Sequence, residues 1–182
     1  MVFLKENRLD WRTAFGLGRP GTWLMPLISM GVAAAVLPAA LVLADVSAWL
    51  LSQLEQPPVE QAAVQALRSM ESPVSQLGFG FVAVFLAPVV EELIFRRILY
   101  PTVRQYTGRA LALCATSLLF AASHANLVTF IPLTFLAVVL TWLYEATDNL
   151  LAPMATHCLF NLANYLYILW QASTNSNGSH SG

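Results

Sequence analysis

The chain has 182 residues, of which 57% are hydrophobic and only 10% are charged, and its formal net charge is −1. Soluble domains carry about 25% charged residues, so this composition excludes a water-soluble globular protein and makes lipid the solvent for most of the surface. The near-neutral charge gives no support to a nucleic-acid partner. The two cysteines both fall in apolar segments, which indicates free thiols rather than a disulfide framework.

Residues 1–21 form a polar, basic leader that we expect at the membrane interface. The apolar run over residues 24–43 then predicts the first membrane-spanning helix, because about 20 apolar residues cross the hydrocarbon core. A basic stretch before an apolar run also resembles a secretory signal peptide, and the residues before Asp45 would tolerate cleavage. We favour an uncleaved helix, because the leader is long and the apolar run is long enough to span.

A connector over residues 45–71 follows and contains a break at Pro57 and Pro58. Apolar residues at helical spacing over 59–70 predict a short amphipathic helix on the membrane surface. A solvated linker helix fits the same pattern, so both interpretations stay open. Four further spans are predicted, over residues 74–100, 110–123, 133–144 and 150–170.

The predicted fold class is therefore all-α, a polytopic transmembrane helix bundle of about five spans plus a surface amphipathic helix. We assign residues 1–172 to a single integral-membrane domain with its motifs within 75–170, and residues 173–182 to a disordered polar tail. Lys and Arg gather in the leader and over residues 96–109. The positive-inside rule then predicts an N-terminus on the cytoplasmic side of the plasma, or inner, membrane.

Two adjacent carboxylates lie inside the second predicted span. A charged group in hydrocarbon costs roughly 2.5–3.5 kcal/mol on insertion scales, so a chain that keeps such groups usually uses them. Glu92 and Arg96 are four residues apart, in the order that favours an ion pair on one helix face. Glu91 points about 100° away from Glu92 and escapes that pairing. It is therefore the candidate general base.

Two later apolar segments add further polar groups. His124 follows small residues that permit close helix packing. His157 and Asn161 are four residues apart, so imidazole and amide project from one helix face and can donate two hydrogen bonds to one oxyanion. Taken singly, each residue is explained as well by a polar contact between helices. Together they are the groups that acyl hydrolysis needs, namely a carboxylate, an imidazole and an amide donor.

Two alternatives use the same residues. Glu91, His124 and His157 can be drawn as the ligands of a zinc metalloprotease. We favour a site without any cofactor, because the His-Glu-x-x-His signature is absent and no two histidines share a predicted helix. The other alternative is a non-catalytic membrane protein, an immunity or scaffold factor that binds a peptide in the same cavity.

Three motifs occur in the order and spacing of a known family of membrane proteases: Glu91-Glu92-x-x-x-Arg96, Phe120-x-x-x-His124 and His157-x-x-x-Asn161. They resemble the CPBP family, named for CAAX processing and bacteriocin processing and also called the Abi or type II CAAX prenyl endopeptidase family. The resemblance covers about residues 75–170. It implies an intramembrane glutamic endopeptidase built as a helical bundle, with a conical cavity open to the cytosol and the lipid.

The resemblance also implies roles for individual residues. Glu91 is implied to activate the water with the help of His124, and His157 with Asn161 to bind the oxyanion. Glu92, with its arginine partner, is implied to support the geometry of the site.

Substrates in this family are proteins or peptides. Eukaryotic members cleave prenylated proteins after the modified cysteine, and many bacterial members are tied to peptide maturation or self-immunity. We therefore expect a membrane-embedded or lipidated substrate, with membrane lipid as the surrounding partner. Such proteins often carry more helices before the glutamate motif than the single span expected here, so the chain is a compact member or a fragment.

One point of topology is left open by the sequence. Glu91 lies roughly 8–13 Å from the predicted end of its helix, whereas His124 lies more than about 20 Å along the next one. For the two side chains to meet, the third helix must begin deeper, tilt strongly or belong to a re-entrant pair.

Overall fold

The computed structural model describes residues 22–178, so the leader over residues 1–21 lies outside the described part of the chain. The described residues contain helices and no strand, which confirms the all-α prediction. The elements in chain order are η1 (Thr22–Leu24), α3 (Met25–Gln53), α4 (Ala62–Arg68), α5 (Pro73–Phe81), η2 (Val82–Leu86), α6 (Ala87–Glu92), η3 (Leu93–Leu99), α7 (Tyr100–Thr107), α8 (Arg109–Ser123), α9 (Leu127–Thr147) and α10 (Leu151–Gly178).

Helices dominate because hydrocarbon offers no water to backbone groups, so each segment must satisfy its own N–H and C=O groups. Three helical stretches are long and apolar enough to cross a membrane: Met25–Gln53, Pro73–Thr107 and Leu127–Thr147. Helix α8 is apolar but shorter. Helix α10 is long but interrupts its apolar residues with polar side chains that belong to the site. Each of these five stretches overlaps a predicted span, and the three long apolar helices confirm a polytopic membrane bundle.

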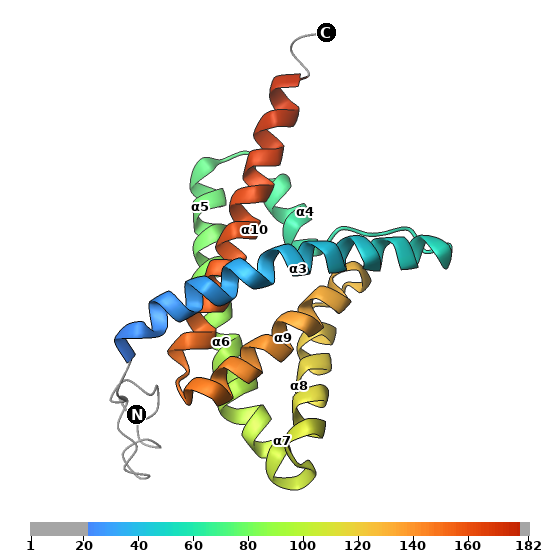
Figure 1. The fold of residues 1–182 in the computed structure, drawn as a ribbon. Helices are drawn as coiled ribbons and strands as arrows, with labels where there is room; N and C mark the ends of the chain where they lie inside the picture. Colours follow the sequence, from blue (N-terminus) through green and yellow to red (C-terminus); the bar gives the residue numbers. More distant parts are fainter. Residues whose placement is uncertain (1–21, 179–182) are drawn as a thin grey trace.

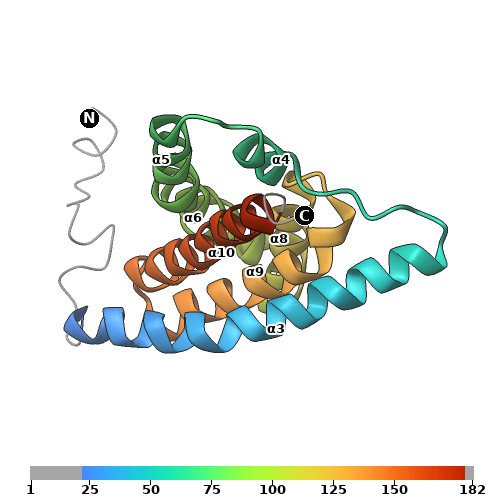
Figure 2. The ribbon, with the colours of Figure 1, turned by 90° about the horizontal axis from the view of Figure 1, so that it is seen from above.

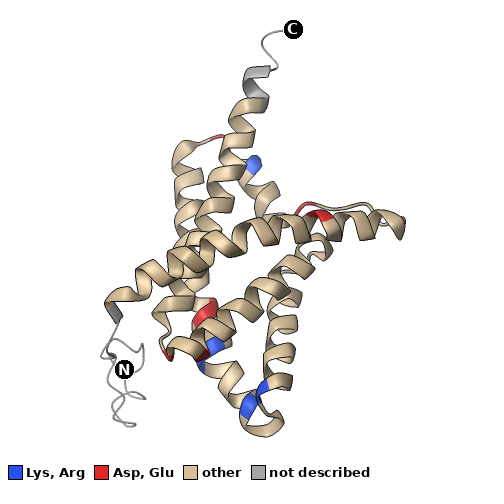
Figure 3. Cartoon of the chain, viewed as in Figure 1, with Lys and Arg blue, Asp and Glu red and all other residues tan. Residues whose placement is uncertain are grey.

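The helices pack around α10. Helix α3 lies along one side of the bundle and packs across α9 and α10, while α5 and α6 lie on the other side of α10 (Figures 1 and 2). The core where α3, α9 and α10 meet is a small apolar cluster: Val36, Ala40, Leu136, Leu140 and Phe160. Charged side chains are sparse along the helices and gather near the glutamates and at the turn between α7 and α8 (Figure 3).

The second span is one continuous helix over Pro73–Thr107, longer than the predicted 74–100. From the sequence, Pro101 and Gly108 both mark the turn after this span; the structure confirms Gly108, and the prediction for Pro101 is wrong. Pro88 and Pro101 each stand in the first turn of an α-helical stretch that follows a π-helical segment, η2 or η3 respectively. A wider turn of this kind accommodates a residue that lacks an N–H, so the helix continues. The two π-helical segments flank the glutamate pair, as π-bulges often do at functional sites.

The turn lies instead at Gly108, whose φ of 82° suits glycine. Glu91 lies roughly 17 residues before this turn and His124 roughly 16 after it, so each is about 25 Å away along its own helix. One helix ends at the turn and the other begins there, so the two helices run antiparallel. Glu91 and His124 therefore lie at about the same distance from the turn. The open question of topology is answered by the length of the second helix.

Three other boundaries differ from prediction. Helix α3 continues to Gln53, so the connector is shorter than expected. Helix α9 begins at Leu127, earlier than the predicted start at residue 133, so Pro132 lies inside it. Membrane helices tolerate such a proline when neighbouring groups satisfy the freed carbonyl. Helix α10 continues to Gly178, into the segment predicted to be a disordered tail, because extending an existing helix costs less than starting one.

The predicted surface helix exists as α4 but is only 7 residues long. Its Leu67 is buried, at 2% exposure, and together with Val64 and Ala63 it lines a cavity inside the bundle. Helix α4 therefore covers the bundle's interior, which neither of the two open interpretations included.

Candidate active site

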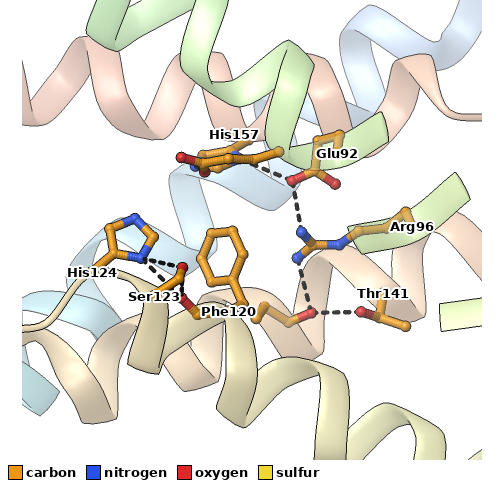
Figure 4. Close-up of polar contacts among 9 residues, drawn as sticks. Glu92, Arg96, Phe120, Ser123, His124, Thr141 and His157 are labelled. Carbon is orange, nitrogen blue, oxygen red and sulfur yellow. Dashed lines mark hydrogen bonds and ion pairs between the residues drawn. The ribbon is translucent and has the colours of Figure 1, made fainter. Parts of the chain in front are cut away.

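The centre of the site is a buried carboxylate with two partners. The Oε1 atom of Glu92 lies 2.9 Å from Nη1 of Arg96 and 2.9 Å from Nδ1 of His157 (Figure 4). Glu92 is 0% exposed and the other two are each 1% exposed. A charge withdrawn from water in this way is stable only beside an opposite charge. The structure confirms the predicted pairing of Glu92 with Arg96 and adds His157 to it.

The guanidinium group of Arg96 is held on two further sides. Its Nη2 donates a hydrogen bond to the carbonyl oxygen of Ala137, at 3.3 Å. Its Cζ lies 4.9 Å from the centroid of the Phe120 ring, which places the positive charge over an aromatic face. The arginine thus links α9 and α8 to the helix that carries the glutamates.

The ring of His157 is oriented by this arrangement. Its Nδ1 donates to the Glu92 carboxylate, so the other nitrogen, Nε2, points away from Arg96 and towards Glu91. Nε2 lies 3.7 Å from Oε2 of Glu91, too far for a direct hydrogen bond. One bridging oxygen atom, from water or from a substrate, can contact both groups.

A cavity of about 450 Å³ opens beside these groups. The four residues predicted to be catalytic, Glu91, His124, His157 and Asn161, all line it. The side chain of Glu91 is 27% exposed, whereas that of Glu92 is fully buried. The two neighbouring carboxylates thus differ in position: Glu92 is enclosed beside Arg96, and Glu91 faces the cavity.

His124 lies at the C-terminal end of α8, where its Nδ1 is 2.9 Å from the carbonyl oxygen of Phe120. A carbonyl can only accept, so Nδ1 carries the proton and Nε2 of the neutral ring is an acceptor. The Phe120 ring packs against both imidazoles, with centroid distances of 5.0 Å to His124 and 5.6 Å to His157 (Figure 4). The phenylalanine thus spaces the two histidines along one wall.

Asn161 is fixed by a bond to the helix opposite. Its Nδ2 donates to the carbonyl oxygen of Ala83, at 2.9 Å, within the π-helical segment η2. An amide nitrogen has two N–H groups, so one remains for a ligand in the cavity. Asn164 also lines the cavity, but its Nδ2 donates to Phe160 of its own helix.

Tyr165 is a cavity residue that the sequence analysis did not single out. Its hydroxyl donates to the carbonyl oxygen of Gln76, at 2.9 Å, which fixes the ring against the opposite helix. The ring lies directly over Gly80, where an added Cβ would stand 2.6 Å from the ring carbon Cζ. The local sequence around a tyrosine in an apolar helix does not indicate such a contact. The hydrogen bond to Gln76 joins residues that are 89 positions apart.

Metal binding was the chemical alternative for Glu91, His124 and His157. Within residues 22–178, no group of three His, Cys, Asp or Glu side chains lies in an arrangement that could hold a metal ion. One nitrogen of each histidine is already bonded, to Glu92 in one ring and to Phe120 in the other. A histidine bonded through Nδ1 still offers Nε2 as a ligand, so the zinc hypothesis stays a prediction that treatment with a chelator tests.

The part of the chain that carries these groups matches a known protein family, Type II CAAX prenyl endopeptidase Rce1-like, over residues 73–163. A curated relative, named "Putative membrane peptidase YdiL" from Bacillus subtilis, is 28% identical over 80 residues, which cover 44% of this chain. The match spans only 33% of that relative. No solved structure matches the chain. The family match includes all three motifs and half of the chain, so this integral membrane protein belongs to the Rce1-like family of type II CAAX prenyl endopeptidases.

Proposed function

We propose that this chain is an intramembrane endopeptidase that hydrolyses a peptide bond in a membrane-embedded or lipidated protein or peptide, with a water molecule activated by Glu91. One observation carries the proposal. Three helices bring a carboxylate that lies outside the Glu92–Arg96 ion pair, two imidazoles and an amide into a single cavity. Membership in a family of peptidases supports the same conclusion.

In the proposed reaction, Glu91 takes a proton from the water as the water's oxygen attacks the carbonyl carbon of the peptide bond. His124 offers Nε2 as an acceptor and holds the water in line. Glu91 then passes the proton to the leaving amine, so that both products are neutral at the cleaved bond. Each of these steps needs a group that reaches the cavity. The side chain of Glu92 is buried and does not reach it.

The negative charge that develops on the carbonyl oxygen needs donors. Asn161 has one N–H free for it, and His157 donates from Nε2 when its ring is protonated. The bond from Nδ1 to the Glu92 carboxylate holds the ring so that Nε2 faces the cavity. Glu92 is thus a positioning residue, and it acts on the substrate only through His157.

The substrate class follows from the walls of the cavity. Apolar side chains of α3, α4, α5, α9 and α10 surround the polar groups, which suits a substrate that carries a lipid or belongs to the membrane. We place the protein in the plasma membrane with its N-terminus in the cytoplasm, because the basic residues around the turn between α7 and α8 follow the positive-inside rule.

The test is a cleavage assay with the full chain purified in detergent, on a prenylated CAAX peptide and on a leader peptide. We expect Glu91→Gln to lower the rate by roughly 10²- to 10⁴-fold, the usual contribution of a general base. Glu60→Gln is the matched control, because Glu60 also lines the cavity but pairs with Arg68 at 3.0 Å.

Unchanged turnover by Glu91→Gln would overturn the proposal. Wild-type protein that binds both peptides and cleaves neither would favour the immunity or scaffold factor instead. Loss of activity on treatment with a chelator, with recovery on adding Zn²⁺, would favour the metalloprotease.

A further inference from the structure

A second groove lies on the outer face of the bundle, between α8 and α9. It encloses about 430 Å³ and shares no residue with the catalytic cavity. Its lining is apolar apart from a single arginine: Arg109, Ala110, Leu113, Val138, Val139 and Trp142. This groove combines one cationic residue with apolar side chains, whereas the catalytic cavity combines a carboxylate, imidazoles and amides.

The order of these residues along the two antiparallel helices gives the groove a polarity. Arg109 is the first residue of α8, and Leu113 lies one turn further, about 6 Å into the apolar part. On α9, Trp142 comes after Val138 and Val139, which places the indole towards the same end as the arginine. Tryptophan and arginine at one end are typical of the lipid headgroup level. The valines and the leucine then extend towards the hydrocarbon.

The cationic end of the groove keeps a net positive charge. Arg109 Nε lies 2.8 Å from Glu145 Oε2, and Arg104 Nη1 lies 2.8 Å from Oε1 of the same carboxylate. Two guanidinium groups therefore share one negative charge. The side chains of Arg109 and Arg104 are 63% and 50% exposed, so both retain N–H groups that a further ligand can reach. Basic residues colour the ribbon at the turn between α7 and α8 (Figure 3). A second anion is the ligand that this cluster lacks.

We propose that this groove is a binding site for one anionic phospholipid of the cytoplasmic leaflet, with the phosphate of the headgroup on Arg109 and an acyl chain along Leu113 and Val138. The charge complementarity selects an anionic headgroup over a zwitterionic one. The apolar length of the groove selects a lipid over a free anion. The site does not depend on the proposed peptidase activity, because none of its residues contacts the catalytic groups.

The test is native mass spectrometry of the full chain in detergent with phosphatidylglycerol or phosphatidylcholine of identical acyl chains. We expect roughly fivefold greater retention of phosphatidylglycerol, the factor that one basic residue near an anionic surface typically contributes. Arg109→Gln should remove that preference. Arg68→Gln is the matched control, since Arg68 is also paired with a glutamate but lies outside the groove, and it should leave the preference unchanged.

Leu113→Trp tests the acyl part of the groove with every charge intact, and it should reduce retention of both lipids. Equal retention of the two lipids by the wild-type chain would overturn the proposal, and so would an undiminished preference in Arg109→Gln. Displacement of the lipid by millimolar inorganic phosphate would also overturn it, because the site would then recognise an anion and no acyl chain. Thermal unfolding of each variant shows whether it is folded. If Arg109→Gln is not folded, the retention of the two lipids by Leu113→Trp tests the proposal instead.

Discussion

The buried ion pair makes a sharp prediction for the variant Glu92→Gln. The substitution keeps the shape of the side chain and removes its charge, so Arg96 loses its carboxylate at 2.9 Å while remaining 1% exposed. Removing one partner of a buried ion pair costs about 3–5 kcal/mol, because the remaining charge is left uncompensated. The amide oxygen of the new side chain still accepts a hydrogen bond. We therefore expect a loss near the lower limit, about 3 kcal/mol.

The measurement is equilibrium unfolding in mixed micelles, with a denaturing detergent added to a mild one. Glu91→Gln is the matched control, because it makes the same substitution one residue earlier, at a carboxylate that is 27% exposed and lies outside the Glu92–Arg96 ion pair. We expect its free energy of unfolding to change by less than about 0.5 kcal/mol. The two neighbouring variants should thus separate: one loses stability, and the other loses catalysis at full stability.

A double variant refines the comparison. Glu92→Gln combined with Arg96→Met removes the stranded charge as well, so part of the lost stability should return. If Glu92→Gln unfolds at the same detergent fraction as Glu91→Gln, then Glu92 does not compensate Arg96. The assignment of Glu92 to the scaffold would then be wrong.

Two further predictions concern glycines. Gly80→Ala places a Cβ 2.6 Å from the Tyr165 ring, so the ring must move within the cavity and peptide cleavage should slow by roughly ten- to a hundredfold. Gly78→Ala is the control and should cleave at the wild-type rate, because its Cβ meets no atom within 4 Å. Equal cleavage rates for the two variants would refute a role for the Tyr165 ring in shaping the cavity. Gly108→Ala places a side chain on a residue whose φ is 82° and should lower the free energy of unfolding by about 1–3 kcal/mol. Gly31→Ala is the control, because its Cβ has open space and its φ is helical. Unchanged stability of Gly108→Ala would mean that the turn relaxes.

Much of the site could be predicted from the sequence because its local relations depend on helical periodicity alone. Residues four apart share a helix face, so the pairing of Glu92 with Arg96 followed from spacing, and the structure confirms it at 2.9 Å. The same periodicity turned Glu91 away from its neighbour and towards the cavity. Composition indicated a membrane protein, and apolar runs long enough to span indicated helices, because a helix satisfies its backbone groups within its own segment.

The contacts between helices could not be predicted in this way. The bond from His157 to Glu92 joins residues 65 apart, and the bond from Asn161 to Ala83 joins residues 78 apart. No periodicity relates such positions, since their distance depends on how each helix tilts and where it ends. Small errors in a predicted boundary, such as the end of the second span, therefore change which residues meet.

The sequence by itself determined which polar residues lie in apolar segments, on which helices they lie, and that those helices belong in a membrane. Only the tertiary structure decided how they come together. The second helix passes Pro88 and Pro101 and continues to the turn at Gly108, and this extra length brings His124 level with Glu91. Packing of α10 against that helix then gives Glu92 a second partner in His157. Local physics thus determines the elements, and the lengths and contacts of whole helices determine the site.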